Sequence, residues 1–134
     1  MQLEIKNFQS IKNQTVQLKG FTVFEGKSDC GKSALRRAID SLLFNSWDNA
    51  YLREGTRTCT LSLNYDDVSI TQTKGSENSY DIEIAGKRKH FDKVGKDTPD
   101  LLKNLGYSFF ETTQEYYNVH VTTQLEPLYM IYLS

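Results

Sequence analysis

The stretch that decides the fold runs from Phe21 to Ser33 and reads FTVFEGKSDCGKS. Its second part, from Gly26 to Ser33, has the pattern Gly-x-x-x-x-Gly-Lys-Ser, which matches the Walker A motif at every fixed position. Glycines allow positive φ angles, so backbone N–H groups can converge on a phosphate without a Cβ in the way. The lysine supplies an ammonium for the β- and γ-phosphates, and the serine supplies a hydroxyl oxygen for Mg²⁺. The stretch therefore predicts a nucleotide-binding loop.

Apolar residues on both sides of the motif predict the elements that would hold it. Phe21, Val23 and Phe24 predict a dense, inner strand immediately before the loop. After the loop, apolar residues recur at helical spacing and predict a helix from about Lys32 to Phe44. The N-terminus of that helix would direct the positive end of its dipole at the anion. A glycine-rich turn with an exposed lysine and no ligand is the alternative interpretation.

The expected cofactors are ATP and Mg²⁺. The residues expected to contact them from the loop and the first turn of the helix are Gly26, Ser28, Asp29, Cys30, Gly31, Lys32, Ser33 and Ala34, with Ser33 on the metal. Asp29 places a negative charge near the anion, which weakens binding unless the carboxylate points away.

Hydrolysis of ATP needs more than this loop, because an acidic residue on an apolar strand must hold Mg²⁺ and another group must orient the attacking water. No apolar run ending in such an acidic residue follows the motif. The nearest acidic pair is Asp66-Asp67, which lies between two alternating segments and predicts a half-exposed hairpin turn. We therefore expect no hydrolysis by this chain alone.

Composition fits one soluble domain. The chain has 134 residues, and its 16 Lys and Arg against 17 Asp and Glu give a net charge of −1, so bulk charge indicates neither a nucleic acid nor a membrane partner. The longest strongly apolar stretch, residues 128–133, is much shorter than the ~20 residues of a membrane helix. Cys30 and Cys59 lack the spacing of a zinc site and indicate reduced thiols. We expect a cytoplasmic protein without a membrane partner.

The rest of the chain predicts mainly strands. Alternating polarity predicts strands at residues 3–8, 15–19, 59–65, 68–73, 80–84 and 119–125. Pro99 predicts the start of a short helix that ends at Gly106. The expected class is α/β with a mixed or antiparallel sheet, in one domain over 1–134 that comprises a P-loop segment (1–58) and a β-rich segment (59–134).

The order of these motifs resembles the N-terminal ATPase lobe of the SMC-like ATPases, which have an ABC-type head with the P-loop NTPase fold. It is most similar to the SbcC-type group of DNA double-strand-break repair and to related phage recombination ATPases. The resemblance rests on the Walker A motif and on residues 3–10, 21–26, 34–39, 43–45, 52–55 and 118–127. It implies that Gln124 is the Q-loop glutamine, which reaches Mg²⁺ and the attacking water. The sequence departs from the family pattern at Ser28-Asp29, where Asn-Gly is common, and at Gln9, where an arginine is common.

The resemblance also implies partners. In the family, a coiled coil and a second lobe with the signature motif and Walker B follow, and neither motif occurs in this sequence. ATP then lies between two heads, which bind DNA and control an SbcD-type nuclease. We therefore expect a C-terminal ATPase lobe or a second head as partner, in an oligomer or hetero-complex. The alternative is a small stand-alone interaction or inhibitor protein, of the kind that phages encode, that uses the same lobe to bind a host partner.

Three further features have two interpretations each. The basic run from Gly86 to Phe91 predicts a solvated hairpin end, or else a turn that contacts DNA phosphates. Trp47 is interpreted as a local anchor rather than as a stacking platform for adenine. His90 and His120 have no partner at metal-ligand spacing and are assigned to the surface or to a strand.

Overall fold

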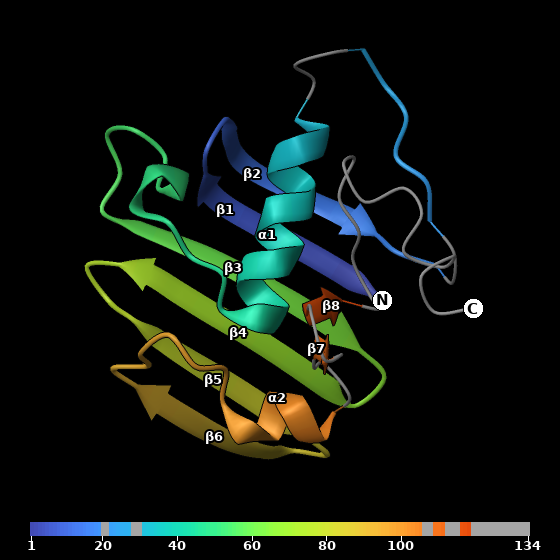
Figure 1. Ribbon diagram of the computed structural model, residues 1–134, viewed down its shortest axis with the longest axis vertical. Helices are drawn as coiled ribbons and strands as arrows, with labels where there is room; N and C mark the ends of the chain where they lie inside the picture. The colour runs from blue at the N-terminus through green and yellow to red at the C-terminus, as the bar shows by residue number, and fades with distance from the viewer. Residues whose placement is uncertain (20–21, 28–30, 106–108, 112–115, 119–134) are drawn as a thin grey trace.

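The computed structural model describes residues 1–19, 22–27, 31–105, 109–111 and 116–118. Most of these residues form one sheet with helices on one of its faces (Figure 1). The strands of this sheet are β1 (Gln2–Phe8), β2 (Ile11–Gln17), β3 (Thr58–Tyr65), β4 (Val68–Gly75), β5 (Ser79–Ile84) and β6 (Lys87–Asp92). The other elements are α1 (Lys32–Phe44), the 3₁₀-helix η1 (Asn49–Tyr51), α2 (Asp100–Asn104), β7 (Phe109–Glu111) and β8 (Tyr116–Asn118).

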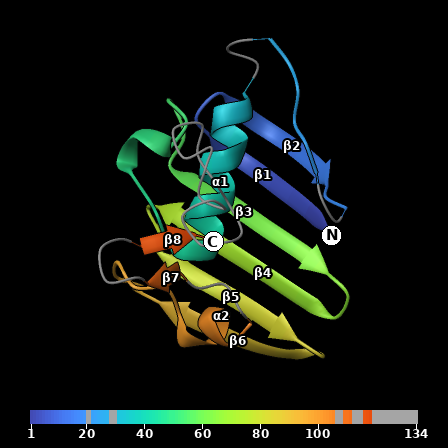
Figure 2. The same ribbon diagram turned by 45° about the vertical axis from the view of Figure 1, so that its right-hand side comes forward.

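The six-stranded sheet is antiparallel throughout, in the order β2-β1-β3-β4-β5-β6, and β7 pairs separately with β8. The chain leaves the sheet after β2, passes through the Walker A motif and α1, and returns as β3 on the other side of β1. Figures 1 and 2 show α1 crossing one face of the sheet, with α2 near β6 on the same face. The long connection from β2 to β3 therefore holds the motif at one end of α1.

The two faces of the sheet differ in polarity, because successive side chains of a strand point to opposite faces. On the face toward α1, one row of directly paired residues runs Ile5, Leu61, Gln72, Tyr80 and Phe91. A neighbouring row on the opposite face runs Thr15, Glu4, Ser62, Thr71, Asp81 and His90. This separation gives the sheet one core-forming face and one polar face.

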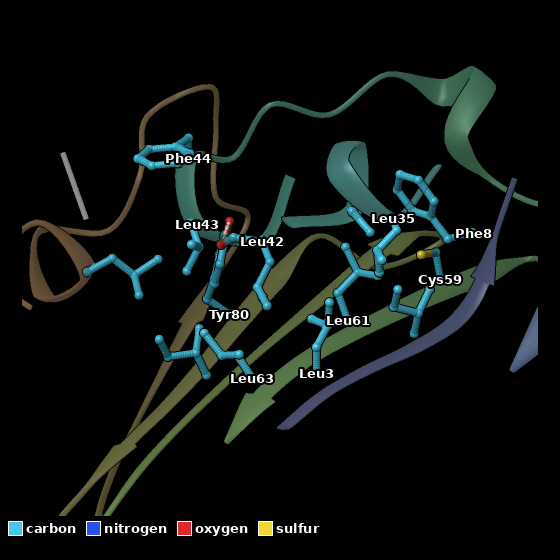
Figure 3. Close-up of a cluster of buried hydrophobic side chains, with 14 of the residues drawn as sticks. Leu3, Phe8, Leu35, Leu42, Leu43, Phe44, Cys59, Leu61, Leu63 and Tyr80 are labelled. Atoms are coloured by element: carbon cyan, nitrogen blue, oxygen red, sulfur yellow. Dashed lines mark hydrogen bonds between the residues drawn. The ribbon is translucent and has the colours of Figure 1, made fainter. Parts of the chain in front are cut away.

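The core lies between α1 and the sheet. Leu35, Leu42 and Leu43 of α1 face apolar side chains from the strands (Figure 3). Leu42 is fully buried, and burial of a side chain of this size contributes about 1.5–3 kcal/mol. The free thiol of Cys59 also lies in this core, and burial raises its pKa to about 12, so it is unreactive at neutral pH.

A buried polar group fixes the C-terminal half of α1. Gln72 lies in the middle of the core face, and its side-chain oxygen accepts a hydrogen bond from Ser41 Oγ at 2.8 Å. Its side-chain nitrogen lies 2.8 Å from the carbonyl oxygen of Ser41 and 2.7 Å from the hydroxyl of Tyr80. That hydroxyl in turn lies 2.9 Å from the carbonyl oxygen of Leu42. The helix is thus tied to β4 and β5 by satisfied buried hydrogen bonds.

Most of the elements predicted from the sequence are confirmed. The helix at 32–44 has the predicted limits, and the hairpin of β3 and β4 turns at Asp66-Asp67 as predicted. β1, β5 and the short helix after Pro99 are also present. β2 begins at Ile11 rather than near residue 15, because its first half is polar and gives no alternation signal.

The predicted inner strand before the motif is wrong over its described part. Residues 22–25 form no strand, and Val23 and Phe24 are 63% and 40% exposed. An apolar run shows that a segment can enter a sheet but not that neighbouring strands are available to pair with it. Within the described residues, nothing pairs with this segment.

The basic run that was expected to be a hairpin end or turn is instead the edge strand β6. The sequence does not predict this strand, because its first four residues are lysine, arginine or histidine in succession, which hides the alternation of polarity. The predicted strand at 119–125 lies outside the described residues, as do Gln124 and His120. Among the described helices, none has the length and apolar character needed to cross a membrane.

Candidate nucleotide site

The second glycine of the motif forms the start of α1. Gly31 is the N-cap residue, with φ 90° and ψ 4°, a left-handed conformation that residues with a Cβ rarely adopt. Its carbonyl oxygen accepts the first hydrogen bond of the helix, from Leu35 N at 2.9 Å. A Cβ built on Gly31 would meet no atom within 4 Å, so space is open on that side. The glycine is thus needed for its backbone conformation rather than for close packing.

The ammonium of Lys32 turns back over the loop. Its Nζ donates to the carbonyl oxygen of Lys27 at 2.7 Å and also to that of Gly26. These contacts hold the positive charge beside the first glycine of the motif and close to the N-terminus of α1. A lysine at this place adds its charge to the partial positive charge of the helix end.

The side chains in the first turn of α1 would not repel an anion. It contains no acidic residue, and Ser33 is exposed, so its hydroxyl is accessible to a hard cation such as Mg²⁺. Ala34 is 5% exposed and its side chain belongs to the core, which leaves only its backbone N–H for a ligand. The residues that the structure describes therefore fit a magnesium-bound phosphate group.

Four of the predicted site residues cannot be placed. Ser28, Asp29 and Cys30 in the middle of the loop lie outside the described residues, and so does Gln124. The roles assigned to them stay predictions. Gly26 is described, is exposed and lies at the start of the loop.

Two arginines that sequence reasoning did not assign lie beside Gln9, one of the positions at which the sequence departs from the pattern of the family that it resembles. Arg53 donates from Nη1 to the carbonyl oxygens of Gln9 at 3.2 Å and Ser10 at 2.8 Å. Arg37 of α1 lies 3.4 Å from Oε1 of Gln9. The turn between β1 and β2 is thereby held against α1. The segment Leu52–Gly55, which is part of the family resemblance, is the signal in the sequence that points to Arg53.

Trp47 and the acidic pair Asp66-Asp67 contribute to the fold rather than to the nucleotide site. The ring of Trp47 contacts Phe8 and Tyr51 at centroid distances of 6.2 and 5.9 Å, which confirms its interpretation as a local anchor. Asp66 and Asp67 lie in the turn between β3 and β4, as predicted. Across the described ranges, no group of three or more His, Cys, Asp or Glu side chains could hold a metal ion.

Comparison with known proteins supports the motif. A family model described as the AAA ATPase domain matches residues 1–129, almost the whole chain. No curated protein matches this sequence. The match extends well beyond the eight residues of the motif and includes both the helix and the antiparallel sheet. The chain therefore belongs to the AAA ATPase domain family.

Proposed function

We propose that this chain binds Mg-ATP through Gly26–Ala34 and is the N-terminal ATP-binding lobe of an SMC-like, SbcC-type ATPase. The observation that carries the nucleotide site is the left-handed Gly31 at the start of α1, with Lys32 held over the loop beside it. The ammonium of Lys32, the backbone N–H groups and the hydroxyl of Ser33 then lie together at the N-terminus of α1. Membership of the AAA ATPase domain family supports the same ligand.

The lobe is incomplete for hydrolysis by itself. No acidic residue lies in the first turn of α1, and the acidic pair Asp66-Asp67 lies in a hairpin turn rather than at the end of a buried strand. A C-terminal lobe or a second head would supply the missing carboxylate, and Gln124 would add the Q-loop contact. The exposed apolar side chains of Val23 and Phe24 support such a partner, because they immediately precede the loop and exposed apolar side chains are typical of a surface that another protein covers.

The cellular role that we propose is DNA double-strand-break repair or recombination, together with an SbcD-type nuclease. It rests on the sequence resemblance. The second candidate is a stand-alone interaction or inhibitor protein, which the same exposed segment favours, because its apolar side chains would then be covered by a host ATPase.

Isothermal calorimetry tests the nucleotide site. Mg-ATP should bind the wild-type chain, and Lys32→Ala should weaken binding by at least about tenfold, since a charged hydrogen bond contributes about 1.5–3 kcal/mol. Lys19→Ala removes an exposed lysine outside the motif and is the matched control. Equal affinities for wild type and Lys32→Ala would overturn the proposed site.

Measurements of ATP turnover and of thermal stability test whether the lobe is incomplete for hydrolysis. The purified chain should release no phosphate above background, and its melting temperature should rise only modestly with Mg-ATP, following RT ln(1 + [L]/Kd). Steady hydrolysis by the chain alone would contradict the proposed incompleteness. Restoration of turnover by an added C-terminal lobe supports the ATPase role, whereas inhibition of a complete head supports the inhibitor.

A further inference from the structure

Arg37 is a partly buried cation on α1 that forms no ion pair within the described part of the chain. Its Nη1 lies 3.4 Å from Oε1 of Gln9, which is longer than the usual N–H···O distance of about 2.7–3.2 Å. A guanidinium carries several N–H donors in a fixed plane. Most of the donors of Arg37 are therefore left for solvent or for a ligand.

The neighbouring Arg36 differs in this respect. Its guanidinium forms an ion pair with Asp40, one turn further along α1. Successive residues of a helix point in directions about 100° apart, so the two arginines lie on different faces of α1. The charge of Arg36 is neutralised within the helix, whereas a counter-anion for Arg37 has to come from outside it.

Arg37 shares a face of α1 with Ser33, the residue expected to hold Mg²⁺. Residues four positions apart in a helix lie one above the other, and their Cα–Cβ bonds tilt toward the N-terminus of the helix. The side chain of Arg37 therefore extends back toward the turn that carries Ser33. One turn measures about 5.4 Å along the axis, which an arginine side chain can span. Figures 1 and 2 agree with this direction, because the turn between β1 and β2 that Arg37 contacts lies beside the N-terminal half of α1.

The residue that Arg37 contacts is itself held in place. Gln9 has φ 47°, a left-handed conformation that is uncommon for a residue with a Cβ. Its N–H donates to the carbonyl oxygen of Tyr51 at 2.7 Å, and its own carbonyl oxygen accepts from Arg53 at 3.2 Å. Oε1 of Gln9 thus meets Arg37 from a fixed backbone, and less conformational entropy is lost when a positioned side chain binds a ligand.

We propose that Arg37 binds the γ-phosphate of the nucleotide and that Gln9 positions its guanidinium for this contact. In magnesium-dependent phosphate sites the metal bridges the β- and γ-phosphates, so a cation on the Ser33 face of α1 is expected on the γ-phosphate side. A guanidinium binds phosphate oxygens through two parallel hydrogen bonds, which suits the unused donors of Arg37. The phosphate would supply the anion that Arg37 lacks among the described residues.

This inference rests on the proposed nucleotide site and deepens it, because it names the residue that would distinguish ATP from ADP. Lys32 and the backbone N–H groups of the loop act on phosphates that both nucleotides contain. Arg37 would act on the one phosphate that ADP lacks. Its removal should therefore affect the two nucleotides unequally.

The test is isothermal calorimetry of the full chain with Mg-ATP and with Mg-ADP. Arg37→Gln should raise the Kd for ATP at least about tenfold and the Kd for ADP less than about threefold, since a charge-assisted hydrogen bond is lost only with ATP. Arg36→Gln removes the same charge from the next residue of α1 and is the matched control, which should change either Kd less than about threefold.

Gln9→Glu tests the same contact without removing Arg37. The added carboxylate would pair with the guanidinium and neutralise it, so the Kd for ATP should again rise at least about tenfold. The melting temperatures of all these variants without nucleotide should stay within about 3 °C of the wild type, which excludes unfolding as the cause of a lost affinity.

Equal losses in Arg36→Gln and Arg37→Gln would overturn the inference, as would equal losses of ATP and ADP affinity in Arg37→Gln. Unchanged ATP affinity in Arg37→Gln and Gln9→Glu, together with a loss in Lys32→Ala, would also overturn it but would leave the proposed nucleotide site intact. ATP binding that Lys32→Ala does not weaken would refute the site itself, and this inference with it.

Discussion

Ser41 of α1 donates a hydrogen bond from Oγ to Oε1 of Gln72 on β4 at 2.8 Å, and both side chains are fully buried. This bond joins the helix that carries the Walker A motif at its N-terminus to the centre of the sheet. The neighbouring Tyr80 hydroxyl completes the connection. The position of the motif therefore depends on polar contacts one helix length away from it.

Replacement of Gln72 tests this connection. Gln72→Met keeps the volume but leaves Ser41 and Tyr80 with fewer partners, so the free energy of unfolding should fall by about 1–3 kcal/mol. Urea unfolding followed by circular dichroism measures it. Thr73→Val, the next residue on β4 and on the opposite face, should change it by less than about 0.5 kcal/mol. Equal effects would show that the buried hydrogen bonds contribute nothing specific.

Lys74 is buried, and we expect it to make the free energy of unfolding depend on pH in the alkaline range. Its ammonium lies 2.6 Å from Oδ1 of Asn78, and desolvation by burial lowers its pKa. Because the folded state binds fewer protons than the unfolded state above the lowered pKa, this residue makes stability rise with pH up to about 10.5. Lys74→Met should be at least as stable at pH 7 and should lose that rise.

The measurement for Lys74 is urea unfolding at several pH values between neutral and alkaline. Lys12→Met, at an exposed position of β2, is the control and should keep the wild-type dependence on pH. If Lys74→Met and the wild type keep the same difference in free energy at every pH, the proposed desolvation is wrong.

Replacement of Gly31 tests the role of the loop in nucleotide binding, and Gly55 is the matched control. Both have positive φ, 90° and 78°, and an added Cβ would meet no atom within 4 Å at either. Gly31→Ala and Gly55→Ala should each cost about 1–2 kcal/mol of stability, since an L-residue is strained in this conformation. Only Gly31→Ala should also weaken Mg-ATP binding in calorimetry, by about tenfold or more. Loss of binding in both variants would mean that general destabilisation is the cause.

Phe24 and Phe8 test the correction to the predicted inner strand. Phe24 is 40% exposed and Phe8 is fully buried. Phe24→Ser should change the free energy of unfolding by less than about 0.5 kcal/mol, whereas Phe8→Ala should lower it by about 3–5 kcal/mol. Thermal or urea unfolding of the two variants decides the matter. A cost above about 2 kcal/mol for Phe24→Ser would place that side chain in a core after all.

Sequence patterns were sufficient to predict the elements that depend only on residues close together in the chain. The periodicity of Leu35, Ala38 and Leu42 predicted α1 to its limits, and the acidic pair between two alternating runs predicted the turn from β3 to β4. The Walker A pattern predicted a helix beginning at Lys32, with a glycine before it that has positive φ. These features depend on residues within a few positions of one another, so the sequence by itself is enough.

The tertiary structure alone decided what depends on distant neighbours. Whether Phe24 enters a sheet depends on strands from elsewhere, and a charged run such as β6 becomes a strand because β5 lies beside it. The contacts of Arg53 with Gln9 and of Gln72 with Ser41 join residues more than thirty positions apart, which no periodicity reveals. The sequence by itself therefore determined the helix, the turn and the nucleotide motif. Only the folded chain, through pairing and burial between remote segments, decided which strands form and which side chains are buried.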